Sequence, residues 1–257
     1  MIVISIVIAT YNARQNIQNC LESLILQKNE KVELIIIDGG STDGTLDIIR
    51  DNTNVINYWI SEPDNGIYEA WNKGITQCHG DWIMFLGADD RLFPDAIASY
   101  LDFINSDKSI DQIDLISSRV QMIDSMGNPI RIKGWSFQWP LFLKEMTVAH
   151  VGALHSRKLF EKYGLFDTSY KIVGDYELLL RPGAQLKSRY LDKLTAIMSE
   201  GGVSDSVKSI REHYRAASST GKYPKVKSLS NAIIVYLKFK LKHFARLLGF
   251  NIYMRKP

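Results

Sequence analysis

Hydrophobic residues in the first third of the chain occur as short, nearly continuous runs separated by segments with helical periodicity. The apolar runs fall at 2–9, 32–37, 55–60 and 82–86, and the helical patterns at about 15–26, 45–51 and 67–76. A strand buried on both faces gives a continuous apolar run, whereas a strand with one solvated face alternates. The repeated order of strand and helix predicts an α/β fold in which helices cover a mostly parallel sheet.

This rhythm changes after about residue 94. A helix is predicted at 95–105, a hairpin around 125–128 and an aromatic loop at 135–142. The sequence shows no internal repeat and no low-complexity linker. With 257 residues, of which 46% are hydrophobic and 23% charged, the chain is long enough for one large domain or for one domain with an appendage.

Polar segments follow all four predicted strands. They are Thr10-Tyr11-Asn12, Asp38-Gly39-Gly40-Ser41-Thr42-Asp43-Gly44, Ser61-Glu62-Pro63-Asp64-Asn65-Gly66 and Gly87-Ala88-Asp89-Asp90. Each segment taken alone could be only a turn or a helix cap. Turn chemistry does not, however, require a carboxylate directly after the second strand or a pair after the fourth. Because ligands of open α/β sheets bind outside the carboxyl ends of the strands, we interpret these segments as one binding site.

Asp89 and Asp90 are candidate metal ligands. Mg²⁺ and Mn²⁺ prefer oxygen ligands and commonly bridge one or two carboxylates to substrate phosphates. Two other nucleotide-binding classes are disfavoured, because the chain lacks both Gly-x-x-x-x-Gly-Lys-Ser/Thr and a Gly-x-Gly-x-x-Gly after the first strand. Cys20 and Cys78 have neither close spacing nor a Cys/His cluster, so we expect neither a disulfide framework nor a structural zinc site.

In this order, the four polar segments resemble the successive signatures of family 2 glycosyltransferases. The resemblance continues over roughly residues 1–205, through His150, Gly164-Leu165-Phe166-Asp167, Gly174-Asp175-Tyr176-Glu177-Leu178-Leu179-Leu180-Arg181 and Gly201-Gly202-Val203-Ser204. It is closest to bacterial members that build O-antigen, capsule or exopolysaccharide repeat units. The resemblance implies the GT-A fold, which is Rossmann-like with a mostly parallel central sheet and flanking helices. Residues 1–94 would form the nucleotide-sugar-binding half, 95–205 the acceptor and catalytic-base half, and 206–257 a basic helical tail.

The activity that the resemblance implies is inverting, metal-dependent transfer of a sugar from a nucleotide diphosphate sugar, a UDP-sugar, to a saccharide hydroxyl. The expected acceptor is a lipid-linked oligosaccharide of bacterial surface polysaccharide synthesis. A nucleotidyltransferase is an alternative, but such enzymes normally have a basic glycine-rich loop after the first strand. A catalytically decayed sugar-nucleotide-binding protein is the non-enzymatic alternative. Retention of Asp89, Asp90 and Asp175 argues against it.

The same resemblance assigns residues to the nucleotide and the metal. Thr10 and Tyr11 would line the base, Asp38 would lie at the uracil or ribose edge, and Asp64 would help to close the nucleoside site. Lys73 would face the diphosphate. Asn12 and Asp89 would also bind the nucleotide. The metal motif of the family is Asp-x-Asp, and here Gly87 occupies its first position. The aspartate that usually contacts the ribose is therefore missing. Asp89, with Asp90 beside it, remains as the expected ligand of Mn²⁺ or Mg²⁺.

Asp175 lies where the family places its general base. An inverting transfer needs one carboxylate to take the proton of the acceptor hydroxyl as that hydroxyl attacks C1 opposite the leaving diphosphate. The alternative role for Asp175 is to cap a helix at 176–181. His150 is a candidate for contact with the acceptor or the metal, or else a core histidine. Trp71 and Trp135 could stack on acceptor sugars, although such aromatic residues more often pack in the core.

The C-terminal tail is strongly basic. Residues 222–257 hold nine of the 31 Lys and Arg residues and no Asp or Glu, which leaves 22 basic against 28 acidic residues elsewhere. Apolar residues recur at steps of four and three, namely Leu229, Ile233, Leu237, Leu241, Phe244 and Leu248, while Lys238, Lys242 and Arg246 share another face. This pattern predicts a basic amphipathic helix.

The tail helix has no apolar stretch near the roughly 20 residues that a membrane-spanning helix needs. We expect it to lie on an anionic membrane surface, through residues 222–257, and we expect no nucleic-acid partner. The alternative is a helix packed on the body or on a second subunit of a homo-oligomer. The N-terminal apolar run lacks a basic leader and predicts a buried strand instead of a signal peptide. The expected location is therefore cytoplasmic, peripheral on the inner face of the cell membrane.

Overall fold

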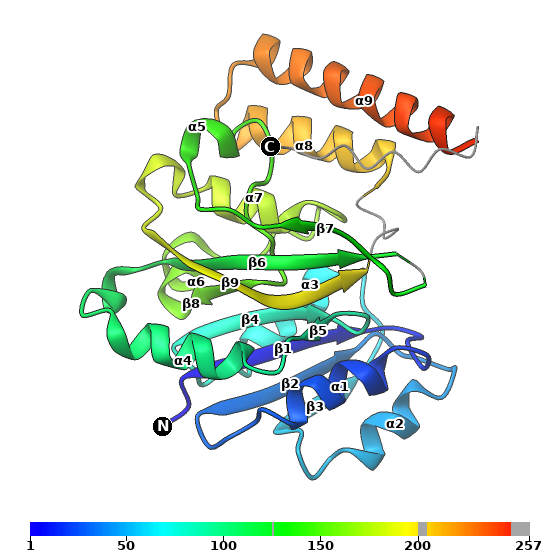
Figure 1. Cartoon of the computed structure of the whole chain (residues 1–257), viewed down its shortest axis with the longest axis vertical. Coiled ribbons are helices and arrows are strands. Elements are labelled where there is room, and N and C mark those ends of the chain that lie inside the picture. The colour runs from blue at the N-terminus through cyan, green and yellow to red at the C-terminus, as the bar shows by residue number, and fades with distance from the viewer. Residues whose placement is uncertain (125, 200–204, 248–257) are drawn as a thin grey trace.

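The computed structural model describes residues 1–124, 126–199 and 205–247, and it is an α/β structure with helices on both faces of one sheet (Figure 1). The first third consists of β1 (Ile4–Thr10), α1 (Ile17–Ile25), β2 (Val32–Asp38), α2 (Thr45–Asp51), β3 (Tyr58–Ser61), α3 (Ile67–Ile75) and β4 (Trp82–Gly87). The four strands are parallel and lie in the order β3-β2-β1-β4. The predicted succession of strands and helices is confirmed here.

Strand β3 begins three residues later than the apolar run at 55–60 predicts. The Asn57 backbone N–H donates to Leu34 O (2.9 Å), and Asn57 Oδ1 accepts from Leu34 N (3.0 Å). The ladder between β2 and β3 starts at the next residue, where Tyr58 pairs with Ile35. Ile56 is buried in the core although it precedes the strand. Hydrophobicity alone does not distinguish such a buried loop residue from a strand residue.

The second part of the chain extends the same sheet and makes it mixed. Its elements are β5 (Arg91–Leu92), α4 (Ala96–Ser106), η1 (Ile110–Gln112), β6 (Leu115–Ile123), β7 (Pro129–Lys133), α5 (Trp139–Phe142), β8 (Ala153–Ser156), α6 (Arg157–Tyr163), α7 (Gly174–Leu180), η2 (Gly183–Gln185) and β9 (Ser188–Ser199). The order continues from β4 as β8-β6-β9-β5, with β7 paired to β6. Strand β8 is antiparallel to both of its neighbours, whereas β6 and β9 are parallel. The predicted hairpin joins β6 to β7, although its residue 125 lies outside the described residues.

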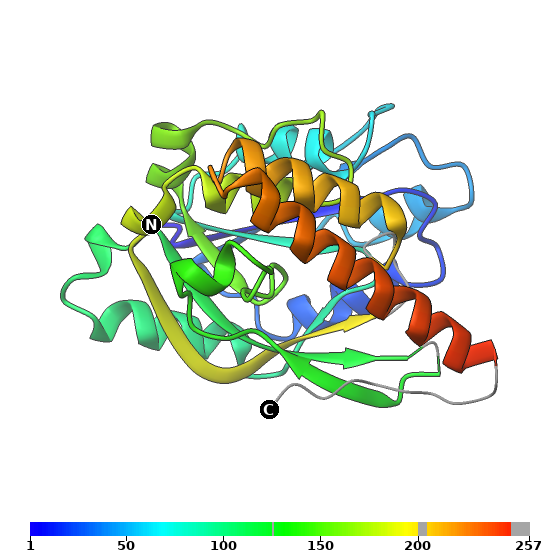
Figure 2. The same cartoon turned by 90° about the horizontal axis from the view of Figure 1, so that it is seen from above.

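Two C-terminal helices, α8 (Val207–Ser219) and α9 (Lys225–Leu247), complete the described structure. Helix α8 packs on α7, with Ala216 and Ala217 fully buried and the His213 ring stacked on Tyr176 at 4.2 Å. Helix α9 lies over α8 as the outermost layer (Figures 1 and 2). The predicted tail helix is thus confirmed up to residue 247, and Leu248, Arg255 and Lys256 lie outside the described residues. The division of the chain at residues 94 and 205 stays a prediction.

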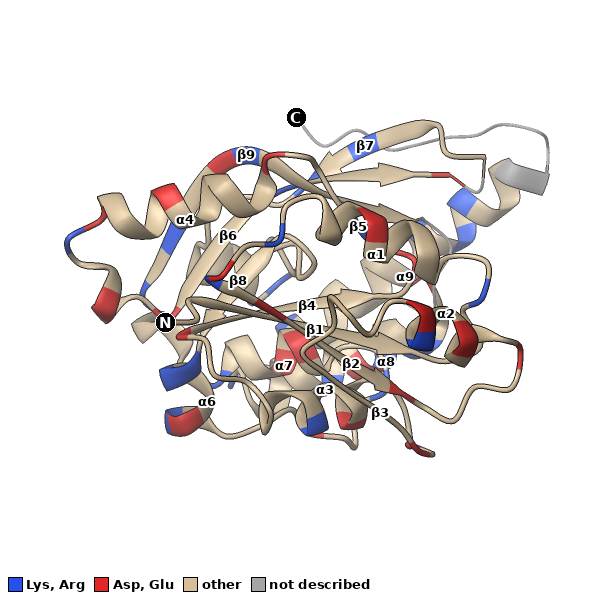
Figure 3. Ribbon diagram, turned by 90° about the horizontal axis from the view of Figure 1, so that it is seen from below, with Lys and Arg blue, Asp and Glu red and all other residues tan. Residues whose placement is uncertain are grey.

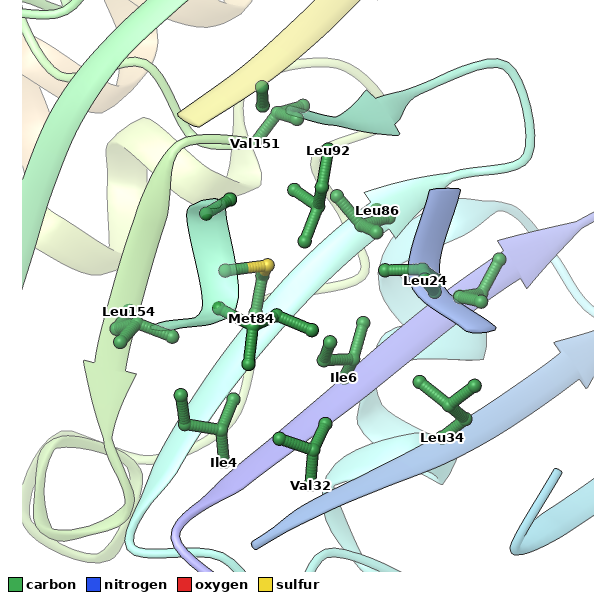
Figure 4. Packing of buried hydrophobic residues seen from close by; sticks show 14 of the residues in the cluster. Ile4, Ile6, Leu24, Val32, Leu34, Met84, Leu86, Leu92, Val151 and Leu154 are labelled. Carbon is green, nitrogen blue, oxygen red and sulfur yellow. The ribbon is translucent and has the colours of Figure 1, made fainter. Parts of the chain in front are cut away.

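Both faces of the sheet are buried at β1, β2 and β4, which explains the uninterrupted apolar runs there. On β1, Ile4, Ile6 and Ile8 enter a core beneath α1, α2 and α4, part of which is shown in Figure 4. Val7 and Ala9 point to the opposite core, which includes residues of α3, α6, α7 and α8. Among the described helices, none is long and apolar enough to cross a membrane.

Acid should destabilise this fold through buried histidines. Burial lowers the pKa of His150 to about 3, so below about pH 6.5 the unfolded chain binds a proton that the folded chain does not. The free energy of unfolding is therefore unaffected by protonation of His150 above that pH, and it decreases as the pH falls below it. His150→Leu should therefore lose about 2 kcal/mol less free energy of unfolding than the wild type between about pH 7 and 5. Urea unfolding at both pH values measures this difference.

Phe166→Leu is the matched control, because it removes buried volume beside the His150 ring without removing an ionisable group. It should lower the free energy of unfolding equally at the two pH values. If His150→Leu has the same pH dependence as the wild type, His150 does not contribute in this way.

Candidate functional site

The four polar segments meet at one edge of the sheet, because the strands that they follow are parallel neighbours. The last residues of β1 and β2, Thr10 and Asp38, are paired, and Asp38 is also paired with Ser61 at the end of β3. On the other side of β1, Ala9 pairs with Gly87 at the end of β4. The candidate site is therefore built from loops that the sheet itself brings together.

Asp38 fixes the loop between β2 and α2. Its side chain is fully buried. Oδ2 accepts hydrogen bonds from the backbone N–H groups of Gly40 (3.0 Å) and Ser41 (2.8 Å) and from the Ser61 hydroxyl (2.7 Å), and Oδ1 accepts from the Ser41 hydroxyl (2.5 Å). A nucleotide would have to share an oxygen that already accepts bonds from the chain. The role of Asp38 at the uracil or ribose edge stays a prediction.

The segment after β1 forms the mouth of this edge. Thr10 Oγ1 is buried and has no hydrogen-bond partner among the described residues, while the Tyr11 side chain is 66% exposed. Asn12 adopts φ +46°. Its N–H donates to Ser41 Oγ (2.7 Å), and its Oδ1 accepts from Thr42 N (3.0 Å). Asn12 thus holds two loops together, whereas Tyr11 presents an accessible ring.

Gly39 brings Tyr11 and Asp64 close to one another. A Cβ atom on Gly39 would lie 2.8 Å from Asp64 Oδ2 and 3.3 Å from Tyr11 Cδ2. The other oxygen of Asp64 accepts from the Gly66 N–H (2.8 Å), which orients the carboxylate. The missing side chain of Gly39 therefore leaves room between an exposed aromatic ring and a fixed carboxylate, which are two groups suited to a nucleoside.

Lys73 lies on α3 and is held by neighbouring groups. Its Nζ lies 2.8 Å from Glu62 Oε1 and donates to Pro63 O at 3.2 Å. The hydrogen bond to Glu62 raises the pKa of Lys73. Contact with a diphosphate would require this ammonium group to leave or share Glu62, so that assignment stays a prediction.

Asp89 and Asp90 follow β4 in different environments. Asp90 is buried, and its Oδ2 accepts from the Gly87 N–H at 2.8 Å, whereas Asp89 is exposed. Burial, followed by the charge of Asp89, raises the pKa of Asp90 to about 8. A Cβ atom at Gly87 would lie 2.9 Å from Asp89 Oδ1 and 3.2 Å from Asp90 Oδ2. The glycine that departs from the family motif thus gives both carboxylates room.

The donor set at Asp89 and Asp90 fits a hard divalent cation that also binds substrate. Neither carboxylate forms a salt bridge with a described residue. No group of three or more His, Cys, Asp or Glu side chains in the described parts of the chain could hold a metal ion. Mg²⁺ commonly takes only one or two carboxylates and completes its coordination with phosphate and water. The two aspartates would therefore need the diphosphate as a further ligand.

Asp175 lies in the first turn of α7 and contacts Tyr68 of α3. The Tyr68 hydroxyl donates to Asp175 Oδ1 at 3.0 Å. Burial raises the pKa of Asp175 to about 6, opposed by hydrogen bonds to its charged form from the Tyr176 backbone and Tyr68. Helix α7 begins at Gly174 with Val173 at the N-cap, so the alternative in which Asp175 caps the helix is wrong.

Tyr68 is a site residue that the sequence did not single out. Since α3 starts directly after the loop that follows β3, Tyr68 connects Asp175 to the edge where the polar segments meet. A Cβ atom on Gly174 would lie 2.9 Å from the Tyr68 ring, so the glycine allows the two helices to approach. Nothing local in the sequence indicates a partner 107 positions away.

The three candidate acceptor residues are not gathered at one point of the surface. The His150 ring lies 4.7 Å from Trp71 and 5.4 Å from Phe85, and its nitrogens have no hydrogen-bond partner among the described residues. Trp71 is only 6% exposed, whereas Trp135 is 43% exposed. Burial favours core packing for His150 and Trp71. Acceptor contact stays a prediction for all three.

Comparison with known proteins agrees with this geometry. The family model described as "Glycosyl transferase family 2" matches residues 5–164. A "PGL/p-HBAD biosynthesis glycosyltransferase" of Mycobacterium bovis (strain BCG / Pasteur 1173P2) is 30% identical over 210 residues, which are 79% of each chain. The chondroitin synthase of Escherichia coli is 28% identical over 215 residues, covering 80% of this chain and 30% of that protein.

Two solved structures share the fold. S. aureus TarS 1–349, in complex with UDP-GlcNAc, has a TM-score of 0.67 and 18% identity, over 99% of this chain and 76% of that one. The mannosyltransferase PcManGT from Pyrobaculum calidifontis, in complex with GDP-Man and Mn²⁺, has a TM-score of 0.62 and 14% identity, over 96% and 78%. The expected GT-A-like α/β fold is confirmed. With its sequence relatives and its family match, the chain belongs to glycosyl transferase family 2 and is a nucleotide-sugar-dependent glycosyltransferase.

Proposed function

We propose that this enzyme transfers a sugar, with inversion, from a UDP-sugar to a hydroxyl of a lipid-linked saccharide in bacterial surface polysaccharide synthesis. The observation that supports the proposal is the hydrogen bond from Tyr68, in the helix after the β3 loop, to Asp175. Asp89 and Asp90 follow β4 at the same edge of the sheet as that loop. UDP is preferred as the nucleotide because TarS, which has the same fold, is seen with UDP and with UDP-GlcNAc. Because PcManGT is seen in complex with GDP-Man, a GDP-sugar is the alternative donor to test.

The chemical step assigns one role to each group. The acceptor oxygen forms a bond to C1 of the donor sugar while the bond from C1 to the UDP oxygen breaks, and the hydroxyl proton passes to Asp175. With a pKa of about 6, Asp175 is mostly ionised at neutral pH and still basic enough to take that proton. Asp89 and Asp90 would hold Mn²⁺ or Mg²⁺, which supplies charge neutralisation for the leaving diphosphate.

The metal proposal predicts that EDTA abolishes sugar transfer and that Mn²⁺ or Mg²⁺ restores it, because two adjacent carboxylates would otherwise face a diphosphate without compensating charge. Asp89→Asn should cost more activity than Asp90→Asn, since Asp90 is buried and already bonded to the Gly87 N–H. UDP release from a panel of UDP-sugars, with GDP-mannose alongside, measures both effects. Full transfer in EDTA would contradict the metal, and the reverse order of the variants would exchange the two roles.

The base proposal predicts that Asp175→Asn lowers turnover by about 10²-fold or more. The asparagine Oδ1 can still accept from the Tyr68 hydroxyl, so UDP affinity should be nearly unchanged in calorimetry. Turnover of the wild type should fall as the pH drops below about 6, because the protonated carboxyl cannot accept a proton. A parallel loss of UDP affinity and turnover would make Asp175 structural or a nucleotide ligand.

Helix α9 supports the proposed membrane contact. Its buried Ser228 contacts Tyr214 of α8, whereas an apolar stripe is left exposed, each residue of which is 51–78% exposed. The stripe comprises Val226, Leu229, Ile233, Leu237, Leu241 and Phe244. Exposed Lys225, Lys227, Lys238 and Lys240 lie on the same helix. The sequence of α9 holds no acidic residue. Acidic residues do occur on α1, α2, α4 and α6 (Figure 3).

An apolar stripe accompanied by lysines is typical of a helix at the surface of an anionic bilayer, where each basic residue contributes roughly 1 kcal/mol. We therefore place the enzyme peripherally on the inner face of the cell membrane, where a lipid-linked acceptor would be available. A second copy of the chain is the other candidate occupant of this stripe.

Vesicles that contain anionic lipid should bind the full chain, and truncation after Lys222 should abolish binding while transfer to a soluble acceptor remains. High salt should weaken binding only partly, because salt screens charges beyond about 8 Å but does not affect apolar insertion. The double variant Ile233→Ser with Leu237→Ser should remove the salt-resistant part of vesicle binding. The double variant Lys238→Gln with Lys240→Gln should remove the salt-sensitive part. Membrane docking is refuted if the truncated chain binds the vesicles as well as the full chain does. It is also refuted if the full chain is a dimer that does not bind vesicles and that truncation converts to a monomer.

A further inference from the structure

Glu212 of α8 binds the backbone just before the catalytic-base helix. Its carboxylate accepts hydrogen bonds from three successive N–H groups, those of Lys171 (3.1 Å), Ile172 (2.9 Å) and Val173 (3.2 Å). Helix α7 starts at the next residue, and Asp175 is its second member. One side chain thus contacts every residue of the segment 171–173, which leads directly into the base.

These hydrogen bonds fix the segment that enters α7, up to its N-cap residue Val173. Backbone N–H groups at the start of a helix have no partner within the helix, and a capping side chain or another acceptor must supply one. The N-cap residue of α7 is Val173, which has no polar side chain. The carboxylate that fixes this helix start comes from α8, about forty residues further along the chain. Hydrogen bonds from N–H groups to a charged carboxylate are stronger than neutral ones.

The same segment is held on its other side by the loop after β3 and by α3. Lys171 Nζ donates to Asn65 O at 2.8 Å, in the loop that also carries Asp64. The Tyr68 hydroxyl contacts both Ile172 O (2.8 Å) and Asp175 Oδ1 (3.0 Å). Segment 171–173 is therefore held between α8 and the loop after β3, and Asp175 lies two residues beyond it.

We propose that Glu212 is a positioning residue for sugar transfer, which holds Asp175 at the acceptor hydroxyl through segment 171–173. This inference rests on the proposed role of Asp175 as the base. Without Glu212, three N–H groups lose their acceptor and the segment that leads into α7 loses its anchor on α8. A displacement of about 1 Å at a reacting group can cost on the order of 10²-fold in rate. Helix α8 is then part of the catalytic unit, and only α9 is peripheral to it.

The test compares Glu212→Ala and Glu212→Gln in the full chain with Glu161→Ala, an exposed glutamate on α6. Glu212→Ala should lower kcat by about tenfold or more and leave the UDP Kd and the donor KM within about twofold. Glu212→Gln keeps an acceptor oxygen and should recover part of kcat. The control should match the wild type. Amides 171–173 should be protected from hydrogen exchange in the wild type and exposed in Glu212→Ala.

The pH profile separates positioning from general stability. The ionisable groups that face Asp175 are Tyr68 from α3 and Glu212 from α8. Removal of the Glu212 charge should therefore shift the acid limb of kcat to lower pH in both variants, including Glu212→Gln, in which the fold should persist. A stability loss alone would not shift that limb.

A double variant decides whether Glu212 acts through the base. If it does, Glu212→Ala should cause little further loss of kcat in an Asp175→Asn background, since coupled residues are not additive. The inference is overturned if the two losses multiply, if UDP affinity falls together with kcat, or if the Glu212 variants match Glu161→Ala. Failure of the proposed function has a different signature, because Asp175→Asn alone would then leave turnover intact.

Discussion

Burial of both sheet faces at β1, β2 and β4 is the constraint on which the rest of this enzyme depends. Alternate residues of β1 enter two different cores, and the same holds for its neighbours β2 and β4. Such strands have no solvated face on which a polar side chain could work. Binding groups must therefore follow the strands, and parallel pairing brings the ends of β1, β2, β3 and β4 to one edge.

Carboxylates give the loops at that edge their shape. Asp38 accepts two backbone N–H groups and two hydroxyls, while Glu212 accepts three backbone N–H groups beside α7. In both cases the acceptor fixes a segment without regular secondary structure next to a candidate functional residue. Backbone polar groups that are removed from water need such partners. The acidic residues of the candidate site thus divide into those that order the chain and those proposed to bind ligand.

The sequence predicted the first four strands because their signal is local. Each is an apolar run between turn residues, and each is long enough to stand out from its surroundings. Of the strands after residue 94 it predicted only the hairpin that joins β6 to β7, without the bounds of its strands. It did not predict β8 and β9, whose pairing depends on partners far along the chain. Asp89, Asp90 and Asp175 stood in recognisable motifs. Tyr68 and Glu212 were missed because their partners lie 107 and 40 positions away.

Burial would serve both of the functions proposed for Asp90 and Asp175. Burial raises both pKa values, to about 8 for Asp90 and about 6 for Asp175. The difference follows from the neighbours, because Asp89 adds a second negative charge beside Asp90, whereas Tyr68 and the backbone donate hydrogen bonds to the charged form of Asp175. At neutral pH Asp90 favours its ionised form only beside a cation. Asp175 is already mostly ionised at that pH and can accept a proton. Carboxylates pushed apart in this way suit a metal ligand and a base.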